Sequence, residues 1–233
     1  MKAQKAPTLA AHHSAEREPA PAPLFTCPGS SVRHLRLMTL AMPVMTNLYH
    51  QLGSRSLDVQ LTSEHGDVLC MIGAPPCGQG GNAAFLAIGI PILGSGGCTL
   101  VVVDHDVSSK ERSDHIHALL QTTAEMIEHR LVGNDERGFL LLHFHAQQAL
   151  LGGPLEALAV FDQDSRFVAV NRAASALIEL DDDPGRLRCT DRFDVQWLSL
   201  VGYASLCLVE PITLRTRNGA TFFARATLRQ TIA

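Results

Sequence analysis

The sequence lacks the motifs that identify several classes of enzyme and metal protein. Its six cysteines are scattered and none forms a CxxC pair, which argues against a zinc ribbon and a dithiol redox motif. It contains no GxSxG nucleophile elbow and no GxxxxGK phosphate loop. We therefore predict no enzymatic activity, no cofactor and no metal site, and we expect a reduced, cytoplasmic chain with buried thiols.

Charge and long apolar runs are also scarce. Only 18% of the 233 residues are charged, the formal net charge is -4, and Lys and Arg form no block. Such a chain has no electrostatic field that favours a polyanion, so direct nucleic-acid binding is not expected. No run approaches the roughly 20 apolar residues that cross a bilayer, so no membrane segment is expected. The length accommodates one large domain or two of about 100 residues.

Histidines and acids lie close together in three places without completing a metal site. His143 and His145 alternate along an expected strand and would face the same side, whereas His115 and His117 lie two apart on an expected helix and would not. The third place is the run Asp-His-Asp at 104–106. None of these spacings requires a third ligand, and the sequence predicts no bound metal.

The amino-terminal half begins with a segment of low complexity and then becomes periodic. Residues 1–30 are rich in Ala and Pro and have few large apolar groups, so we expect a disordered tail. Apolar residues at helical spacing then predict an amphipathic helix over residues 35–52. Alternating runs predict a hairpin over residues 57–72, with Gly66 at its turn.

A second hairpin and a second long helix complete this half. The strands at 86–93 and 98–106 are mostly apolar, which predicts burial on both faces. Ser108 and Glu111 have the spacing of a capping box, and an apolar stripe then predicts a helix over residues 110–132.

In the carboxy-terminal half the hydrophobic period changes at a single residue. Residues 155–170 alternate as two strands around a turn, and helical spacing starts directly after Asn171, which can cap the helix. A shorter helical segment follows at 194–204. Two final strands meet at Asn218–Gly219, a two-residue turn signal. Two strands, helices and a closing hairpin follow one another as in a PAS domain.

The same half resembles a known family. Residues 155–180, LEALAVFDQDSRFVAVNRAASALIEL, resemble the PAS domain of sigma-54-dependent transcriptional activators of the acetoin-catabolism-regulator type. Residues 214–228, LRTRNGATFFARATL, are similar to the closing hairpin of that domain, and LLHFH at 141–145 is similar to the segment that joins it to the preceding domain.

The amino-terminal half resembles the GAF domain of these activators. Residues 41–73 are similar to its opening, and residues 90–110 and 115–132 are similar to its closing hairpin and last helix. Between Gly73 and Leu86 the chain has only a short loop, whereas the family has a longer segment that walls the GAF pocket. We therefore expect no GAF ligand site.

The resemblance implies an α+β fold in two parts, each an antiparallel sheet covered by helices. A reduced GAF-like domain would occupy residues 31–137, and a PAS domain with its leading strand would occupy residues 138–233. The ATPase and helix-turn-helix domains of the family do not follow the closing hairpin. Both a stand-alone truncated relative and an excised sensory part fit this pattern, and we favour the former.

The function that follows is regulatory. We expect a non-enzymatic cytoplasmic protein connected with transcription control that acts by protein–protein contact. Its expected partners are a second copy, paired through helices 35–52 and 110–132, and a full-length GAF–PAS activator.

The alternative is a sensor that binds a small molecule in the PAS cavity. The residues expected to line that cavity are Phe161, Val168, Leu177, Trp197 and Leu200. A filled hydrophobic core is the other interpretation of the same residues, and we favour it because small domains seldom leave such space unpacked. The sequence does not identify the effector.

Overall fold

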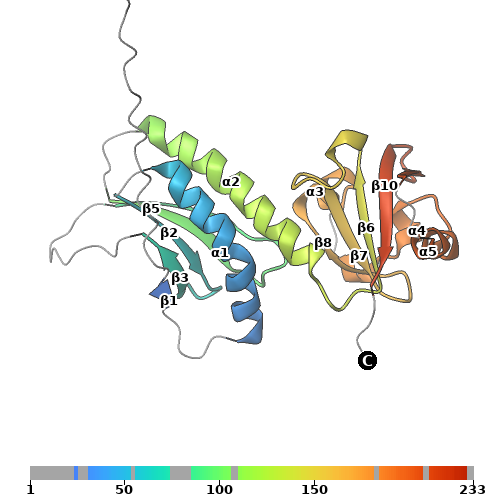
Figure 1. Cartoon of the computed structure of the whole chain (residues 1–233), viewed down its shortest axis with the longest axis horizontal. Helices are drawn as coiled ribbons and strands as arrows, with labels where there is room; N and C mark the ends of the chain where they lie inside the picture. Colours follow the sequence, from blue (N-terminus) through green and yellow to red (C-terminus); the bar gives the residue numbers. More distant parts are fainter. Residues whose placement is uncertain are drawn as a thin grey trace, which may run out of the picture.

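The structure, a computed structural model, contains two five-stranded antiparallel sheets, each packed against helices (Figure 1). It describes residues 24–25, 31–53, 56–73, 85–105, 110–180, 184–206 and 210–229. The strand order is β1-β3-β2-β5-β4 in the first sheet and β8-β7-β6-β10-β9 in the second. The predicted α+β class, with two antiparallel sheets, is confirmed.

Two hairpins and one short added strand form the first sheet. Its strands are β1 (Leu24–Phe25), β2 (Leu57–Thr62), β3 (Val68–Ile72), β4 (Leu86–Pro91) and β5 (Thr99–Asp104). β2 pairs with β3 and β4 pairs with β5, as the sequence predicted.

β1 departs from the expected disordered tail at residues 1–30. Leu24 lies opposite Met71 of β3, and Phe25 lies opposite Cys70. Without β1 the outer edge of β3 would present unpaired backbone N–H and C=O groups, and two added residues satisfy part of that edge. The rest of the predicted tail, up to residue 30, lies outside the described residues.

Helices α1 (Val32–Leu52) and α2 (Lys110–Gly133) pack on one face of the first sheet. Ser31 caps α1 because its Oγ accepts a hydrogen bond from the His34 backbone N–H at 3.3 Å. Both predicted apolar stripes face the sheet. Their buried members include Leu37, Met45, Leu48, Ile116, Leu120 and Ile127. The predicted capping box at residues 108–111 lies partly outside the described residues.

This packing removes one basis of the expected homodimer. The prediction rested on broad apolar stripes that a shortened GAF-like half would bury less completely, but both stripes form the core of their own sheet. Two large apolar side chains of α1 are exposed, Val32 at 84% and Leu35 at 53%. Self-association stays a prediction.

The second hairpin is not buried on both faces, contrary to the sequence prediction. Ala87, Gly89 and Pro91 of β4 are exposed, whereas Ile90 is buried. The reason is that α1 and α2 cover one face of this sheet, so the side chains on the other face of β4 are open to solvent. Apolar composition alone does not show whether one face of a strand is covered or both.

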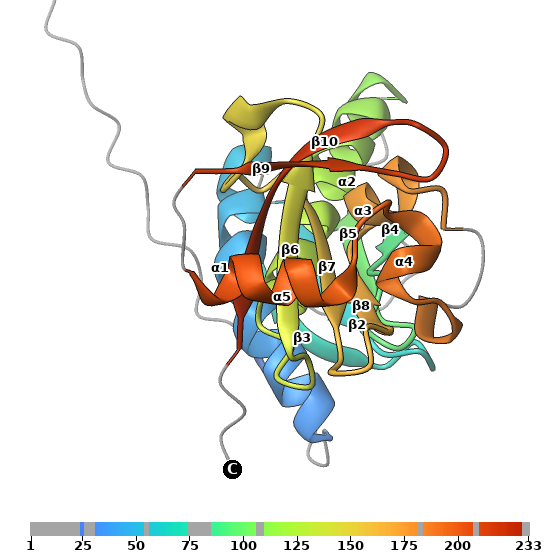
Figure 2. The ribbon, with the colours of Figure 1, turned by 90° about the vertical axis from the view of Figure 1, so that its right-hand side faces the viewer.

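The second sheet has β6 at its centre. Its strands are β6 (Leu140–His145), β7 (Ala157–Phe161), β8 (Phe167–Val170), β9 (Ile212–Arg215) and β10 (Thr221–Leu228). Its helical segments are η1 (Gln148–Leu150), α3 (Arg172–Leu177), η2 (Pro184–Arg186), α4 (Cys189–Arg192) and α5 (Trp197–Ser205). α5 lies across the face of this sheet that is turned away from the first sheet (Figure 2).

Asn171 caps α3 as predicted, and it does more than cap. Its Oδ1 accepts hydrogen bonds from the backbone N–H groups of Ala174, at 3.0 Å, and Leu158, at 2.9 Å. Its Nδ2 donates to the Glu156 backbone carbonyl at 2.9 Å. The side chain is 3% exposed, so one buried amide joins the start of the helix to the start of β7.

The closing turn differs from the predicted two-residue form. Gly219 donates its backbone N–H to the Thr216 carbonyl at 3.0 Å and has φ 94°. Among the described residues with a side chain, only Ser165 and Glu179 have positive φ, so Asn218 does not adopt the left-handed conformation that a type I′ turn needs. Residues 216–219 form a four-residue turn, and Gly219 is its last residue.

Three cysteines lie within the described residues. Cys70, Cys98 and Cys189 are buried and unpaired, which agrees with the expected reduced thiols. Burial raises the pKa of the Cys70 thiol to about 12 and that of Cys189 to about 12, so both are protonated at neutral pH.

In the part of the chain that the structure describes, every helix is too short or too polar to cross a membrane.

Candidate functional site

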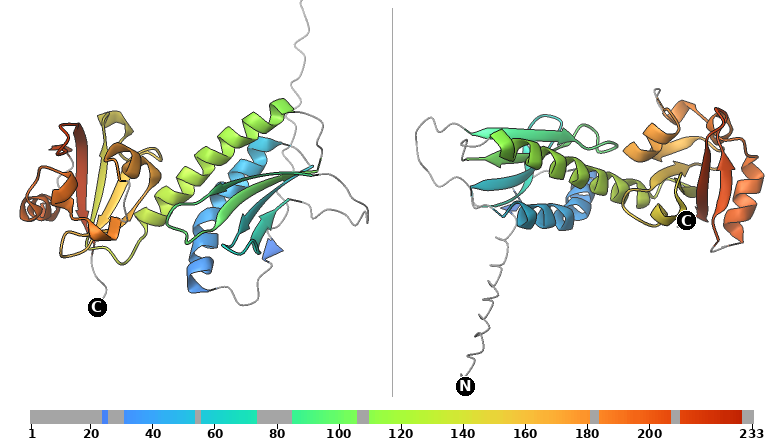
Figure 3. Two further views of the ribbon diagram at one scale, coloured as in Figure 1. Left: turned by 180° about the vertical axis from the view of Figure 1, so that it is seen from behind. Right: turned by 90° about the horizontal axis from the view of Figure 1, so that it is seen from above.

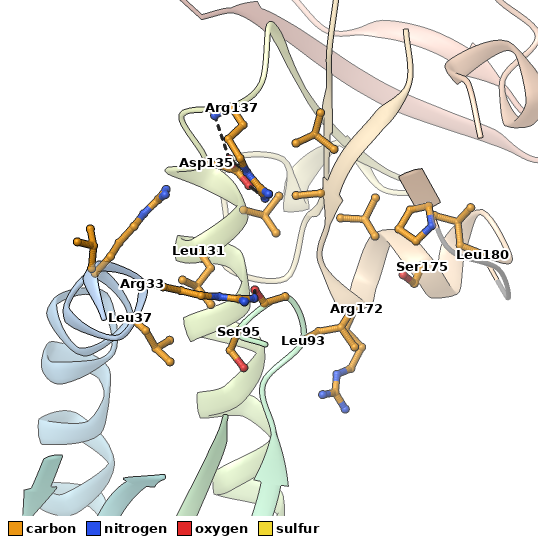
Figure 4. Close-up of a pocket in the computed structure, with 18 residues that line it drawn as sticks. Arg33, Leu37, Leu93, Ser95, Leu131, Asp135, Arg137, Arg172, Ser175 and Leu180 are labelled. Atoms are coloured by element: carbon orange, nitrogen blue, oxygen red, sulfur yellow. Dashed lines mark hydrogen bonds and ion pairs between the residues drawn. The ribbon is translucent and has the colours of Figure 1, made fainter. Parts of the chain in front are cut away.

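α2 runs from the first sheet to the second (Figure 3). A cavity of about 860 Å³ lies between the two sheets, beside the end of this helix (Figure 4). The first part of the chain supplies the start of α1, the loop between β4 and β5, and the end of α2. The second part supplies β8, the first turns of α3 and the residues that follow it. The cavity is thus a joint product of both sheets, and neither half of the chain encloses it alone.

Arginine is the dominant charged residue of the lining. Arg33, Arg36, Arg137 and Arg172 line the cavity together with one acid, Asp135. Arg33 donates to the Gly94 backbone carbonyl at 3.2 Å, and Arg36 donates to the Asn134 backbone carbonyl. These acceptors carry no formal charge.

The other two arginines are paired with carboxylates. Arg137 donates to both carboxylate oxygens of Asp135, at 3.0 and 2.6 Å. Burial raises the pKa of Asp135, but the hydrogen bonds from Arg137 outweigh it, so the net shift is downward and the pair is ionised. The excess positive charge of the cavity therefore comes from Arg33 and Arg36.

The rest of the lining is largely apolar. It includes Leu37, Leu93, Leu131, Val168 and Val170. The hydroxyl of Ser95, which also lines the cavity, donates to the Ile92 carbonyl at 2.7 Å. No histidine or cysteine is found among the described lining residues. Guanidinium groups beside apolar walls favour binding of a carboxylate or phosphate with an apolar body, rather than catalysis.

A buried ion pair holds one side of the cavity together. Glu128, on α2, is fully buried, and its Oε1 accepts from Arg172 Nη2 at 2.8 Å. The same oxygen accepts from the Leu93 backbone N–H at 2.9 Å. Arg172 also donates to the Pro91 carbonyl at 2.9 Å. One carboxylate therefore joins α2, the β4–β5 loop and the first residue of α3.

A second buried carboxylate, from the second part of the chain, contacts His129, the next residue of α2. Glu156, just before β7, is 2% exposed, and its Oε1 lies 3.1 Å from His129 Nε2 and 2.8 Å from His143 Nδ1. Its Oε2 accepts from the Gly152 backbone N–H at 2.6 Å. Burial raises its pKa, but these hydrogen bonds lower it more, and the result is a pKa of about 2.

Arg229 fixes the end of α2 from the second sheet. Its guanidinium donates to the backbone carbonyls of Gly133, at 2.5 Å, and Asp135. Carbonyls at the end of a helix have no partner within it and carry partial negative charge, so a cation there is favourable. Arg36 donates to the next such carbonyl, that of Asn134. The end of α2 is therefore held from both parts of the chain.

The residues predicted from the sequence to line a cavity do not all meet. Phe161 and Leu200 are fully buried in the core of the second sheet, and Leu177 and Trp197 pack against that core. Phe161 and Trp197 are in ring contact at 5.8 Å between centroids. Val168 lies on another cluster, with Val132 and Val160, and lines the cavity between the sheets. One predicted residue thus belongs to the observed cavity.

The histidine pairs noted in the sequence also separate. His143 contacts Glu156, whereas the Nδ1 of His145 accepts from the Gln147 backbone N–H at 3.0 Å. His105 Nε2 lies 2.8 Å from a carboxylate oxygen of Asp58, and residue 106 lies outside the described residues. Sequence analysis missed Arg33, Arg36 and Glu128, because the lining comes from six separate segments that no local pattern connects.

Comparison with known proteins adds little to this description. No protein-family model matches the sequence, and no curated protein matches it. The chain is similar to one chain in the crystal structure of the E. coli DhaR(N)–DhaL complex, with 10% sequence identity and a TM-score of 0.31. The match covers 89% of this chain and 94% of the other. A TM-score this low does not establish a shared fold.

Proposed function

We propose that this chain is a non-enzymatic regulatory protein connected with transcription control, and that it acts by contact with another protein. Its first sheet, with α1 and α2, would be the GAF-like unit of residues 31–137, and its second sheet would be the PAS-like unit of residues 138–233. The order of β7 and β8, then helices, then the β9–β10 hairpin supports the PAS-like assignment. The family resemblance of both halves supports the link to transcription.

The observation that carries the proposal is the cavity between the two units. A ligand that touches both units binds with a strength that depends on how they are placed relative to each other. Such differential affinity is what a ligand needs in order to shift a conformational equilibrium. The buried carboxylates of Glu128 and Glu156 connect the same two units. Occupancy would thereby change the surface that a partner protein meets.

The ligand class follows from the lining. Arg33 and Arg36 supply two guanidinium groups without a carboxylate partner among the described residues, and leucine and valine side chains supply the walls. A small organic anion with an apolar body matches both features. The small molecule of the sensor alternative would then bind in the space between the two sheets, and not in the interior of the second sheet.

Benzoate and its neutral analogue benzamide test the ligand class. Benzoate should raise the melting temperature and benzamide should not, since only benzoate pairs with the guanidinium groups. At ten times Kd the stabilisation would be about 1.4 kcal/mol. Arg33→Met and Arg36→Met should abolish the benzoate shift, whereas Arg215→Met, on β9 and outside the cavity lining, should retain it. Equal shifts with benzoate and benzamide would refute the anion site.

Contact with a partner is tested separately. The purified chain is mixed with a full-length GAF–PAS activator, and the complex is measured by size-exclusion chromatography with light scattering. We expect a heteromeric species, and a change in activator-dependent transcription when both are expressed together. Two results together would contradict the regulatory proposal: no complex, and sequence-specific promoter binding by this chain alone with steep salt dependence.

A further inference from the structure

We propose that His34, Glu64 and Cys98 form a binding site for a transition-metal ion of the Zn²⁺ type. His34 lies in the first turn of α1, Glu64 in the turn between β2 and β3, and Cys98 at the end of the β4–β5 loop. One nitrogen, one oxygen and one sulfur from these three segments all lie within 4.8 Å of one another. No local motif in the sequence marks this group, because 30 or more positions separate each ligand from the next.

The spacing suits tetrahedral coordination. His34 Nε2 lies 3.5 Å from Glu64 Oε2. Bonds of about 2.0 Å to nitrogen or oxygen and about 2.3 Å to sulfur place the ligand atoms of a tetrahedral Zn²⁺ roughly 3.3 to 3.8 Å apart. The first edge already has this length, and the sulfur lies within 4.8 Å of both other ligand atoms. Three protein ligands leave the fourth position to water.

Burial and ligand chemistry select the kind of ion. Cys98 is fully buried, whereas the side chains of His34 and Glu64 are 19% and 42% exposed, so an ion would enter from the side of the carboxylate. Thiolate and imidazole favour Zn²⁺ over Mg²⁺ or Ca²⁺, which prefer oxygen alone. One thiolate and one carboxylate also balance the two positive charges of the ion.

The backbone next to the group is shaped for close approach. A Cβ at Gly97 would lie 2.9 Å from the Glu64 Cβ, so a glycine there lets the turn that carries Glu64 meet the loop that carries Cys98. Two cations are near: the Arg33 guanidinium lies over Gly96, and His65 Nε2 is 3.9 Å from the other oxygen of Glu64. Burial raises the pKa of the Cys98 thiol, and the nearby Arg33 offsets only part of that rise. Arg33 also repels an incoming cation. The carboxylate of Glu64 offsets that repulsion.

A metal here would affect the proposed sensor cavity without being part of it. The β4–β5 loop carries Cys98 and also Leu93 and Ser95, which line the cavity. Coordination would tie this loop to the first turn of α1, next to Arg33. The ion would therefore fix one wall of the cavity.

Cobalt(II) titration tests the site, because a Co²⁺–thiolate bond gives an intense charge-transfer absorption. The full chain should show this band, and Zn²⁺ should displace it. Cys98→Ser should abolish the band and His34→Ala should weaken Co²⁺ binding at least tenfold. The matched controls Cys70→Ser and His117→Ala should leave both unchanged, since Cys70 is buried elsewhere in the same core and His117 is exposed on α2.

A further variant guards against loss of folding. Glu64→Gln lies in a solvent-exposed turn, so it should fold normally and still weaken Co²⁺ binding at least tenfold. The proposal is overturned if wild type gives no charge-transfer band. It is equally overturned if the band persists in Cys98→Ser, which would assign the metal to a different cysteine. Benzoate binding by the metal-free protein would survive either result, so the two proposals fail independently.

Discussion

Replacing Glu156 by Gln should change how the stability of this protein depends on pH. The carboxylate is 2% exposed and is hydrogen-bonded to His129, His143 and the Gly152 backbone N–H. Burial raises the pKa of Glu156, but these hydrogen bonds lower it more, from an ordinary value of 4.5 to about 2. Folding therefore favours the ionised form of this group.

The magnitude follows from linkage. A carboxylate whose folded pKa is depressed stabilises the native state above its unfolded pKa, and that stabilisation is lost as pH falls through the folded pKa. A shift from 4.5 to about 2 corresponds to about 3 kcal/mol at neutral pH. Between pH 5 and pH 3 the native state should lose about 2 kcal/mol from this one group. Glu156→Gln cannot lose it, because the amide does not titrate.

Urea unfolding at a series of pH values from 7 to 3 measures this. Trp197, the single tryptophan, packs against Phe161 in the second sheet and reports its unfolding by fluorescence. The difference in free energy of unfolding between wild type and Glu156→Gln should be constant down to about pH 5 and then shrink by about 2 kcal/mol at pH 3. The control Glu136→Gln, at an exposed position, should follow the wild-type curve.

A parallel pH dependence in wild type and Glu156→Gln would refute this reasoning. It would mean that Glu156 binds its proton equally well in the folded and unfolded chain. The hydrogen bonds from the two histidines would then contribute nothing beyond the cost of burying the carboxylate.

Three further groups of substitutions test other parts of the structure. Asn171→Ala should destabilise by about 2 kcal/mol in urea unfolding, because it removes a cap and leaves two further buried backbone groups unpaired. Gly96→Ala and Gly94→Ala should each cost about 1 kcal/mol because both have positive φ, but only the former meets a guanidinium and should reduce the benzoate shift. Arg172→Met should cost about 3 kcal/mol by leaving Glu128 unpaired, and adding Glu128→Met should recover most of that loss.

Local patterns in the sequence predicted the elements well. Helical spacing over residues 35–52 and 110–132 identified both long helices, because each uses a continuous apolar stripe against one sheet. The change of period at Asn171 located the boundary between β8 and α3, because the capping amide and the first helical turn are adjacent in sequence. These signals come from residues that are close in sequence, because helix capping and the apolar stripe of a helix both depend on local spacing.

Long-range placement was not predictable in this way. Glu156 and His129 are 27 positions apart, and nothing in either local sequence marks them as partners. The pairing of β1 with the edge of β3 depends on the assembled sheet, and the exposed face of β4 depends on which face of that sheet the helices cover. Val168 is apolar, as a core residue would be. It nevertheless lines the cavity, because it lies on the face of the second sheet that packs against α2 and not on the face covered by α5.

The contacts of α2 constrain how a ligand in the cavity can act. Glu128 and His129 are adjacent on this helix, and each bonds to the second unit through a buried group. A ligand that separated the units would have to break the Arg172–Glu128 pair, at a cost of about 3 kcal/mol. A small anion of millimolar affinity has about 4 kcal/mol of binding free energy, and breaking the pair would offset most of it. Occupancy should therefore strengthen the observed placement of the two units, which is why benzoate is expected to raise the melting temperature.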